Sequence, residues 1–271
     1  MGEQHALWNG PAGQAWVESQ EVLDQVLQPF EDLLVGEVGE QGQVLDVGCG
    51  TGATSLAVAR RLGSRGRCTG VDISEPMIAL ARSRAAKELR PPTFIVGDAQ
   101  TYPFEPGRFD SLVSRFGVMF FDDSIRAFAN LRRAAKGGAR LHFLAWRSAA
   151  ENPFMTAAEQ VAAALLPDLP ARRPDEPGPF ALADGDRVRR ILVESGWKGI
   201  HIRPIDVPCT MPERELVRYV TRMGPVGRAL QHVEGATRAR VIERVRAAFD
   251  PYVHGADVRF VSAGWSVAAS A

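Results

Sequence analysis

A glycine-rich turn after a predicted buried strand is the part of the chain best suited to hold a ligand. Residues 44–52 read Val-Leu-Asp-Val-Gly-Cys-Gly-Thr-Gly. Glycines allow positive φ angles and let a ligand approach the backbone closely, and the free amides of a following helix supply donors beside a positive dipole end. Gly48, Gly50 and Ala53 also satisfy the looser dinucleotide-binding pattern. The turn can therefore be interpreted as a site for a dinucleotide, as a site for another ligand, or as a tight turn that binds nothing.

Acidic residues at the ends of predicted strands separate these interpretations. Asp46 occupies a strand position where dinucleotide-binding folds usually have an apolar residue, and a buried carboxylate is costly unless it is paired. A cofactor that carries a cationic amino acid and no phosphate would make this acid useful. Asp72 and Asp98 stand at the ends of the next two predicted strands. The alternative role for each is to cap a turn or a helix.

Four segments resemble, in order and spacing, the class I S-adenosylmethionine-dependent methyltransferases. Residues 44–52 look like motif I, 70–74 like the acidic end of the second strand, 97–104 like the adenine-contact motif and 109–116 like the fourth-strand motif. The resemblance covers residues 41–147 and is closest to the UbiE/menaquinone-methyltransferase-like group of small-molecule enzymes. It implies S-adenosylmethionine as cofactor and S-adenosylhomocysteine as product.

The resemblance also implies which residues bind the cofactor. Asp46 would support the amino group of the methionine part, and Asp72 would accept both ribose hydroxyls, because a carboxylate is a bidentate acceptor. Asp98 would accept from the adenine amino group, with the Ala99 amide donating to a ring nitrogen. The whole set is Trp8, Trp16, Asp46, Gly48, Cys49, Gly50, Asp72, Ile73, Met77, Asp98, Ala99, Ser114 and Arg115.

The other members of this set would surround the rest of the cofactor. Residues 48–50 would line the methionine part, Ile73 and Met77 would flank the adenine, and Ser114 and Arg115 lie where the fourth strand opens toward the methyl group. Trp8, Asn9, Gln14 and Trp16 resemble the N-terminal lid of this group. The two tryptophans among them could cover the sulfonium by a cation–π contact. Their alternative role is a hydrophobic staple onto the first long helix.

Residues after the fourth and fifth strands and in the later insertion are expected to face the methyl acceptor, since ligands bind at the carboxyl ends of parallel strands. These residues are Phe116, Met119, Trp146, Arg147, Phe154 and Phe180. An apolar, aromatic-rich pocket entrance made by these residues would suit a lipophilic or polyketide-like acceptor. A base is needed only if the acceptor must lose a proton, and none is assigned. His142 and Arg115 are candidates, but the alternation of His142 with apolar neighbours favours a structural sheet histidine.

Alternating strands and helices must position these residues. Their spacing predicts an α/β fold with a doubly wound, mostly parallel sheet, which the resemblance completes as a seven-stranded Rossmann-like methyltransferase fold with helical insertions forming a lid. A kink or break is expected at Pro29, and a strand break near Pro204. The predicted strands are 43–47, 67–72, 93–96, 109–114, 139–146, 199–208 and 257–269; the predicted helices are 17–35, 53–62, 75–89, 124–135, 151–166, 187–194, 213–223 and 226–249.

Three regions follow from this order of elements. Residues 1–40 are the expected N-terminal lid and helix, and residues 41–147 the S-adenosylmethionine-binding core. Residues 148–271 are expected to complete the sheet and to form the acceptor pocket with inserted helices.

Composition narrows the classes of partner. The formal net charge is +0, so no overall field would attract nucleic acid. The three cysteines are too widely spaced for a zinc site or a disulfide framework, and no apolar run reaches the about 18 residues of a membrane span. We therefore expect a cytoplasmic protein without a metal, a membrane contact or a nucleic-acid partner. The expected partner is a small-molecule methyl acceptor, and a homodimer is compatible with this expectation.

The expected reaction is methyl transfer to a small, lipophilic or natural-product acceptor by in-line displacement, driven by proximity and orientation. One alternative is an S-adenosylmethionine-binding protein with non-methylating chemistry. A second is a binding or scaffold protein that keeps the fold and transfers no methyl group. A third is an NAD-dependent oxidoreductase, against which Asp46 and residues 97–99 argue.

Overall fold

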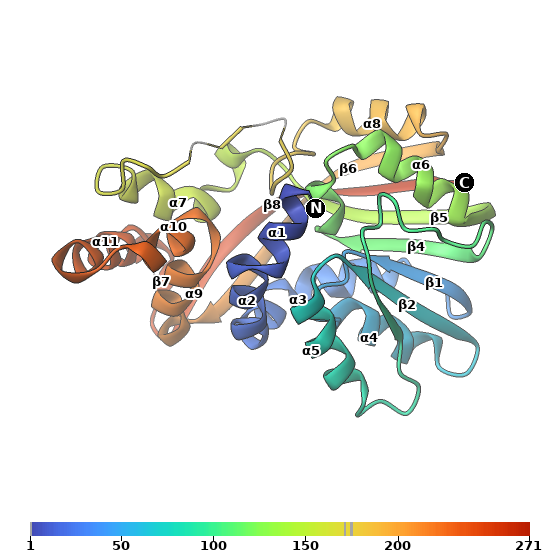
Figure 1. The fold of residues 1–271 in the computed structure, drawn as a ribbon, viewed down its shortest axis with the longest axis horizontal. Helices are drawn as coiled ribbons and strands as arrows, with labels where there is room; N and C mark the ends of the chain where they lie inside the picture. The colour runs from blue at the N-terminus through green and yellow to red at the C-terminus, as the bar shows by residue number, and fades with distance from the viewer. Residues whose placement is uncertain (1, 171, 174–175) are drawn as a thin grey trace.

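One twisted sheet forms the centre of the molecule in a computed structural model that describes residues 2–170, 172–173 and 176–271 (Figure 1). Its strands are hydrogen-bonded in the order β3-β2-β1-β4-β5-β8-β6, and β7 pairs with β8 outside this path. The strands are β1 (Gly42–Val47), β2 (Gly66–Asp72), β3 (Thr93–Val96), β4 (Phe109–Arg115), β5 (Ala135–Trp146), β6 (Lys198–Pro212), β7 (Val253–His254) and β8 (Asp257–Ser270).

The direction of the strands confirms the predicted mostly parallel, seven-stranded sheet, to which β7 adds two residues. β1 to β5 pair in parallel, whereas β8 is antiparallel to both of its long neighbours, β5 and β6. The strand order reverses at β1, which has β2 on one side and β4 on the other. At such a point successive crossovers leave toward opposite faces, and the carboxyl ends of the strands bound a ligand crevice.

Helices cover both faces of the sheet. α3 packs on α4 and against β4, β5 and β6, while α6 packs on α8 and β5. The α-helices are α1 (Glu3–Asn9), α2 (Pro11–Glu18), α3 (Gln20–Gly36), α4 (Ala53–Leu62), α5 (Glu75–Ala85), α6 (Ser124–Ala134), α7 (Pro153–Ala162), α8 (Gly185–Glu194), α9 (Leu216–Arg222), α10 (Gly224–Ala229) and α11 (Gly235–Ala248). The 3-10 turns are η1 (Gly117–Phe120), η2 (Ala149–Glu151), η3 (Glu213–Glu215), η4 (Leu230–His232) and η5 (Asp250–Tyr252).

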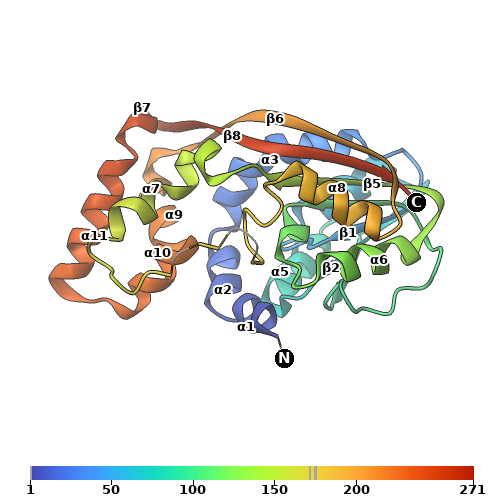
Figure 2. The ribbon, with the colours of Figure 1, turned by 90° about the horizontal axis from the view of Figure 1, so that it is seen from above.

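A helical lobe stands at the far end of the two longest strands. α7, α9, α10 and α11 form it around the ends of β6 and β8, and α1 and α2 lie between this lobe and the sheet (Figures 1 and 2). Its core is aromatic: Phe154 stacks on Phe260 with ring centroids 3.6 Å apart and meets Phe249 edge to face at 5.0 Å. The N-terminal helices and the lobe thus lie at the same end of the sheet (Figures 1 and 2).

The predicted strand break near Pro204 is wrong, and Pro29 does not break its helix. Pro29 lies inside α3, and the predicted helix 17–35 is interrupted at Ser19, between α2 and α3. The buried apolar face of α3 compensates for the hydrogen bond that proline removes. β6 also runs unbroken through Pro204, which pairs with Trp265. β6 is an edge strand, so the missing N–H need not serve a second neighbour.

Other differences concern the ends of elements. α5 stops at Ala85, before the predicted end at Leu89. β5 begins at Ala135 and β6 extends to Pro212, both beyond the predicted bounds. The predicted helix 226–249 is divided into α10, η4 and α11.

Candidate cofactor site

The glycine turn between β1 and α4 is fixed to the end of β2. The amides of Gly48 and Cys49 donate to the Val71 carbonyl at 2.9 and 3.1 Å. Gly48 has a φ of 67°, and a Cβ at this position would lie 2.7 Å from the Cα of Gly117, which follows β4. Only glycine therefore fits where the two strand ends come together.

Asp46 has a buried carboxylate with one oxygen unused. Its side chain comes from β1, and the residue is 1% exposed. The hydroxyl of Ser55, in the first turn of α4, donates to Oδ2 at 2.6 Å, while Oδ1 has no hydrogen-bond partner in the described part of the chain. Burial raises the pKa of Asp46 to about 7, although the Ser55 bond and the charge of Arg115 act in the opposite direction. Because an unpaired buried oxygen is costly, Oδ1 is suited to accept from a cationic ligand group.

Asp72 at the end of β2 holds the turn from its other side. Its Oδ2 accepts from the Gly50 amide at 2.8 Å, and its Oδ1 accepts from the Ser74 amide at 2.9 Å. Burial raises the pKa of Asp72, while the hydrogen bonds from these amides and from Ile73 lower it. Each carboxylate oxygen has two acceptor sites, so both oxygens keep capacity for a ribose hydroxyl.

The segment after β3, predicted to contact the adenine, is held by hydrogen bonds within the protein. Asp98 Oδ1 accepts from the Gln100 amide at 2.9 Å, which is the turn-capping role named as its alternative. The Ala99 carbonyl is held by Asn130 Nδ2 at 2.9 Å. Met77 is buried in α5, and its sulfur would lie 3.8 Å from a Cβ at Gly50. The Met77 side chain therefore lies on the side of the turn where a Gly50 side chain would project.

The N-terminal helices are pinned to the loop between β2 and α5. Asn9 Nδ2 donates to the Ile73 carbonyl at 3.0 Å, and Asn9 Oδ1 accepts from the Glu75 amide at 2.8 Å. The Ser74 hydroxyl donates to the Trp8 carbonyl at 2.7 Å. The sequence did not predict the bridging role of Asn9, because no local pattern links it to a loop 64 residues away. The loop after β2, which carries Ile73, is therefore held against α1 by these three hydrogen bonds.

The two lid tryptophans form an aromatic group with the chain after β4. Trp8 meets Phe120 edge to face at 5.0 Å and Trp16 at 6.2 Å. Trp16 also packs against the main hydrophobic core. Both of the predicted roles, lid and staple, are thus compatible with these contacts.

Ser114 and Arg115 use their side chains for the framework and not for the crevice. Ser114 is fully buried, and its hydroxyl donates to the Val47 carbonyl at 2.7 Å and accepts from the Val118 amide at 3.3 Å. Arg115 Nη1 lies 3.5 Å from Glu31 Oε2, in α3. The resemblance places both residues near the methyl group, and in the structure the packing of α3 and of η1 gives their side chains partners within the protein.

Three predicted acceptor residues come together at the ends of β4 and β5. The rings of Phe116 and Trp146 stack at 3.7 Å, and Phe30 of α3 meets both edge to face at 5.0 Å. The sulfur of Met119 accepts from the Trp146 amide at 3.3 Å. Phe116 has a φ of 67°, which bulky residues rarely adopt. Such strain persists only where the surroundings fix it, often at functional sites.

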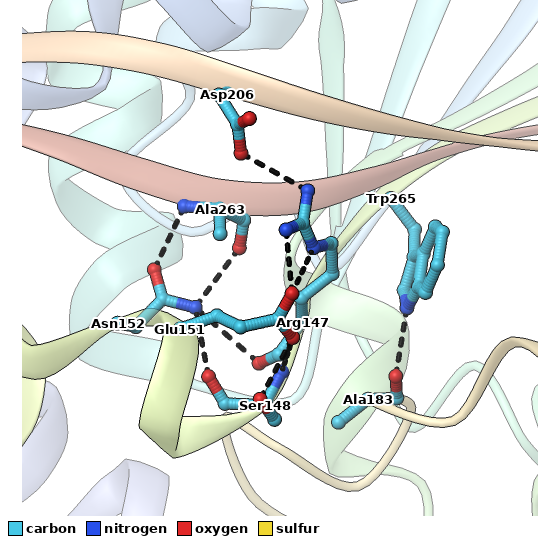
Figure 3. A network of polar contacts seen from close by, with 8 residues as sticks. All are labelled: Arg147, Ser148, Glu151, Asn152, Ala183, Asp206, Ala263 and Trp265. Atoms are coloured by element: carbon cyan, nitrogen blue, oxygen red, sulfur yellow. Dashed lines mark hydrogen bonds and ion pairs between the residues drawn. The ribbon is translucent and has the colours of Figure 1, made fainter.

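Arg147 is not placed to meet an acceptor. Its guanidinium pairs with Glu151 at 2.5 Å and with Asp206 at 3.0 Å, and it lies 5.7 Å from the Trp265 ring (Figure 3). In the same network Asn152 exchanges two hydrogen bonds with the backbone of Ala263. These contacts fasten the start of α7 to β6 and β8, so Arg147 joins the lobe to the sheet.

Phe154 and Phe180 also differ from their predicted role. Phe154 is buried in the aromatic core of the lobe. Phe180 is half-buried, with the guanidinium of Arg172 5.0 Å from its ring. Phe154 therefore belongs to the core of the lobe, whereas the segment before Phe180 approaches the Phe116–Trp146 group, because the Gly178 amide donates to the Met119 carbonyl at 3.1 Å.

His142 lies apart from the strand ends. It faces α3 beside a cavity of about 20 Å³ that Leu34, Glu37 and Arg203 also line. Its Nε2 has no partner among the described residues, and burial lowers the pKa of its imidazole. This position does not support His142 as a base for methyl transfer.

A wider cleft separates α2 from the lobe. It has a volume of about 340 Å³, and α2 lines it with Gln14, Ala15 and Glu18, opposite Arg222 and Gln231. Glu18 and Arg222 approach to 3.3 Å across it.

Within the described residues no cluster of His, Cys, Asp and Glu could hold a metal ion. No helix in the same part of the chain is long and apolar enough to cross a membrane.

Comparison with known proteins finds methyltransferases that are similar to the first part of the sheet and its helices. The methyltransferase domain family matches residues 44–138. Aklanonic acid methyltransferase DauC from Streptomyces sp. (strain C5) is 36% identical over 102 residues, 37% of this chain and 46% of that protein. Demethylmenaquinone methyltransferase from Staphylococcus aureus (strain MRSA252) is 34% identical over 96 residues, 35% of this chain and 39% of that protein. The aligned part spans less than half the length of either relative.

Solved structures share the fold over most of the chain. The YcgJ protein from Bacillus subtilis matches with a TM-score of 0.56 at 18% identity, over 89% of this chain and 97% of that one. Phosphoethanolamine N-methyltransferase 2 from Haemonchus contortus, solved with S-adenosyl-L-methionine, matches with a TM-score of 0.54 at 17% identity, over 100% of this chain and 60% of that one. With the strand order and the glycine turn, these findings identify residues 44–138 as a methyltransferase domain similar to the matched part of the demethylmenaquinone methyltransferases, within a chain that has the fold of solved S-adenosylmethionine-dependent methyltransferases.

Proposed function

We propose that the protein transfers a methyl group from S-adenosylmethionine to a small lipophilic acceptor. The observation that carries this proposal is the pair of buried carboxylates on either side of one glycine turn. Asp72 is tied to the turn through the Gly50 amide, and Asp46 keeps Oδ1 without a partner. A cofactor with an ammonium group and a ribose diol would use both carboxylates, whereas a pyrophosphate would be repelled by them.

The chemistry asks the protein for position more than for reactive groups. When bound, S-adenosylmethionine supplies a methyl group on a sulfonium: the acceptor atom gives an electron pair to the methyl carbon, the carbon–sulfur bond breaks, and its electron pair stays on sulfur. The chain's task is to orient both reactants and to exclude water. The lid, pinned by Asn9 to the loop after β2, supports exclusion of water. We assign no base, because His142 lies under α3.

We propose that the acceptor lies between the strand ends, the lid and the helical lobe. The stacked Phe116 and Trp146 offer an apolar surface at the ends of β4 and β5, and the cleft beside Gln14 offers a route from solvent. Relatives named for aklanonic acid and demethylmenaquinone support a small-molecule acceptor. The three cysteines are free thiols, which suits a reducing compartment such as the cytoplasm.

A screen of lipophilic phenols, quinones and amines with S-adenosylmethionine tests this proposal. We expect S-adenosylhomocysteine and one methylated product to form in equal amounts, and the Asp72→Ala variant to lose most of this activity. Tight binding of S-adenosylmethionine without methylation of any compound in the panel would favour non-methylating chemistry. Binding of NAD in its place would refute the proposal.

A further inference from the structure

Arg84, near the end of α5, joins the glycine turn to the N-terminal helix α3. Its Nη1 donates to the Thr51 carbonyl at 2.7 Å and lies 3.3 Å from the Thr51 hydroxyl. Its Nη2 donates to Asp24 Oδ2 at 2.6 Å, and Gln20 Nε2 donates to the same oxygen at 2.5 Å. A continuous chain of hydrogen bonds therefore runs from α3 through α5 to the turn.

The composition of the turn explains why it needs an outside partner. Gly48, Gly50 and Gly52 all have positive φ within five residues, and glycine loses more backbone freedom on folding than any other residue. Other contacts hold the turn by its amides: Gly48 and Cys49 donate to β2, and Gly50 donates to Asp72. Arg84 holds a carbonyl, that of Thr51, in the middle of the flexible stretch.

We propose that Arg84 is a positioning residue for the cofactor: oriented by Asp24, it fixes the Thr51 peptide so that the turn has its binding conformation before the cofactor arrives. This inference rests on the proposed function, because it requires the turn to bind S-adenosylmethionine. The side chains of Arg84 and Asp24 are each 23% exposed, so their pair is largely shielded from water. A guanidinium can serve both partners at once through its fixed fork of donors, whereas a lysine ammonium is a compact point charge.

The competing explanation is that Arg84 only tethers α3 to α5 and stabilises the fold. A second arginine that pairs with the α5 region provides the control. Arg60 of α4 pairs with Glu88, in the segment after α5, at 2.5 Å, and its hydrogen bonds go to Glu88 and not to the turn. Replacing Arg60 removes an ion pair between α4 and this segment and leaves the Thr51 contact intact.

Calorimetric titration with S-adenosylhomocysteine, together with thermal melting, separates the two explanations. We expect Arg84→Ala to bind about tenfold more weakly, the scale of one lost charge-assisted hydrogen bond, and Asp24→Asn to bind more weakly by a smaller factor. Arg60→Ala should stay within about twofold of the wild type, since exposed pairs contribute little. Arg84→Lys should recover melting temperature but not affinity, and amide hydrogen exchange in residues 48–52 should be faster in Arg84→Ala than in Arg60→Ala.

Wild-type affinity in Arg84→Ala would overturn the inference, as would joint recovery of affinity and melting temperature in Arg84→Lys. If Arg84→Ala does not fold, the folded Asp24→Asn variant decides, because unchanged affinity in that variant would reject the positioning role of Arg84. A wild-type protein that fails to bind S-adenosylhomocysteine would instead reject the proposed function, and the two failures are thus distinguishable.

Discussion

The affinity for the cofactor should rise with pH, because Asp46 must lose a proton to accept the ligand's ammonium group. Burial raises the pKa of Asp46 to about 7 in the free protein. If the ligand binds only the ionised carboxylate, its apparent Kd is the intrinsic Kd multiplied by a factor. This factor is one plus the ratio of protonated to ionised Asp46 in the free protein. With this pKa, the Kd at pH 6 should be about eight times the Kd at pH 7.5.

The assay is calorimetric titration with S-adenosylhomocysteine, which keeps the amino acid part of the cofactor, in two buffers of different ionisation enthalpy. Proton release on binding should be about 0.9 per site at pH 6 and about 0.2 at pH 7.5. Asp46→Asn removes the titrating group, so it should bind weakly and show only the pH dependence of the ligand itself. Subtracting that dependence isolates the contribution of Asp46.

A constant Kd from pH 6 to pH 7.5 in the wild-type protein would refute this reasoning. So would an equal pH dependence in the wild type and in Asp46→Asn. Either result would mean that the unpaired Oδ1 does not receive the ammonium group.

Three further predictions follow from the same contacts. Asp72→Ala should weaken S-adenosylhomocysteine binding by about 1–3 kcal/mol, if its charge-assisted bonds to the ribose are lost; calorimetry checks this, and unchanged affinity would exclude the ribose role. The raised pKa of Asp46 means that its contribution to stability is present below its unfolded pKa of about 4 and is lost as pH rises toward 7. Without ligand, Asp46→Asn should therefore melt at a higher temperature than the wild type at pH 8, and the difference should shrink at pH 5; a lower melting temperature at pH 8 would contradict this. Gln14→Trp should fill part of the cleft between α2 and the lobe. Steady-state kinetics should then show a higher KM for the acceptor with unchanged S-adenosylhomocysteine affinity, and an unchanged acceptor KM would exclude this route.

The residues that the sequence located well share one property: they belong to short motifs at strand ends. Asp46 and Asp72 could be placed on either side of one turn because parallel strands bring their carboxyl ends to the same edge. α4 and β3 have the predicted bounds, since glycines and prolines delimit them.

The residues that the sequence missed or misplaced depend on contacts between distant segments. The sequence places Asn9 in the lid without its bonds to the loop after β2, and it does not single out Arg84, because no local pattern specifies how their helices dock. Arg115 and Arg147 stand at the predicted strand ends, but their guanidinium groups pair with acids of α3 and β6. Strand position fixes where a side chain starts, whereas its direction depends on which partner the tertiary structure brings near.

The acceptor region shows the same limit. Phe116, Met119 and Trp146 come together because they follow adjacent strands. Phe154 lies in the insertion, where its neighbours Phe260 of β8 and Phe249, directly after α11, make it part of the lobe's core. An aromatic residue in an inserted helix predicts burial, but the sequence does not say whether it is buried against a ligand or against the protein.

The central claim is that the turn between Asp46 and Asp72 holds S-adenosylmethionine and not a dinucleotide. Calorimetric titration of the wild-type protein at pH 7.5 with S-adenosylhomocysteine and, separately, with NAD tests it most directly. We predict saturable binding of one S-adenosylhomocysteine per chain and no measurable heat with NAD. Saturable binding of NAD without binding of S-adenosylhomocysteine would contradict the account.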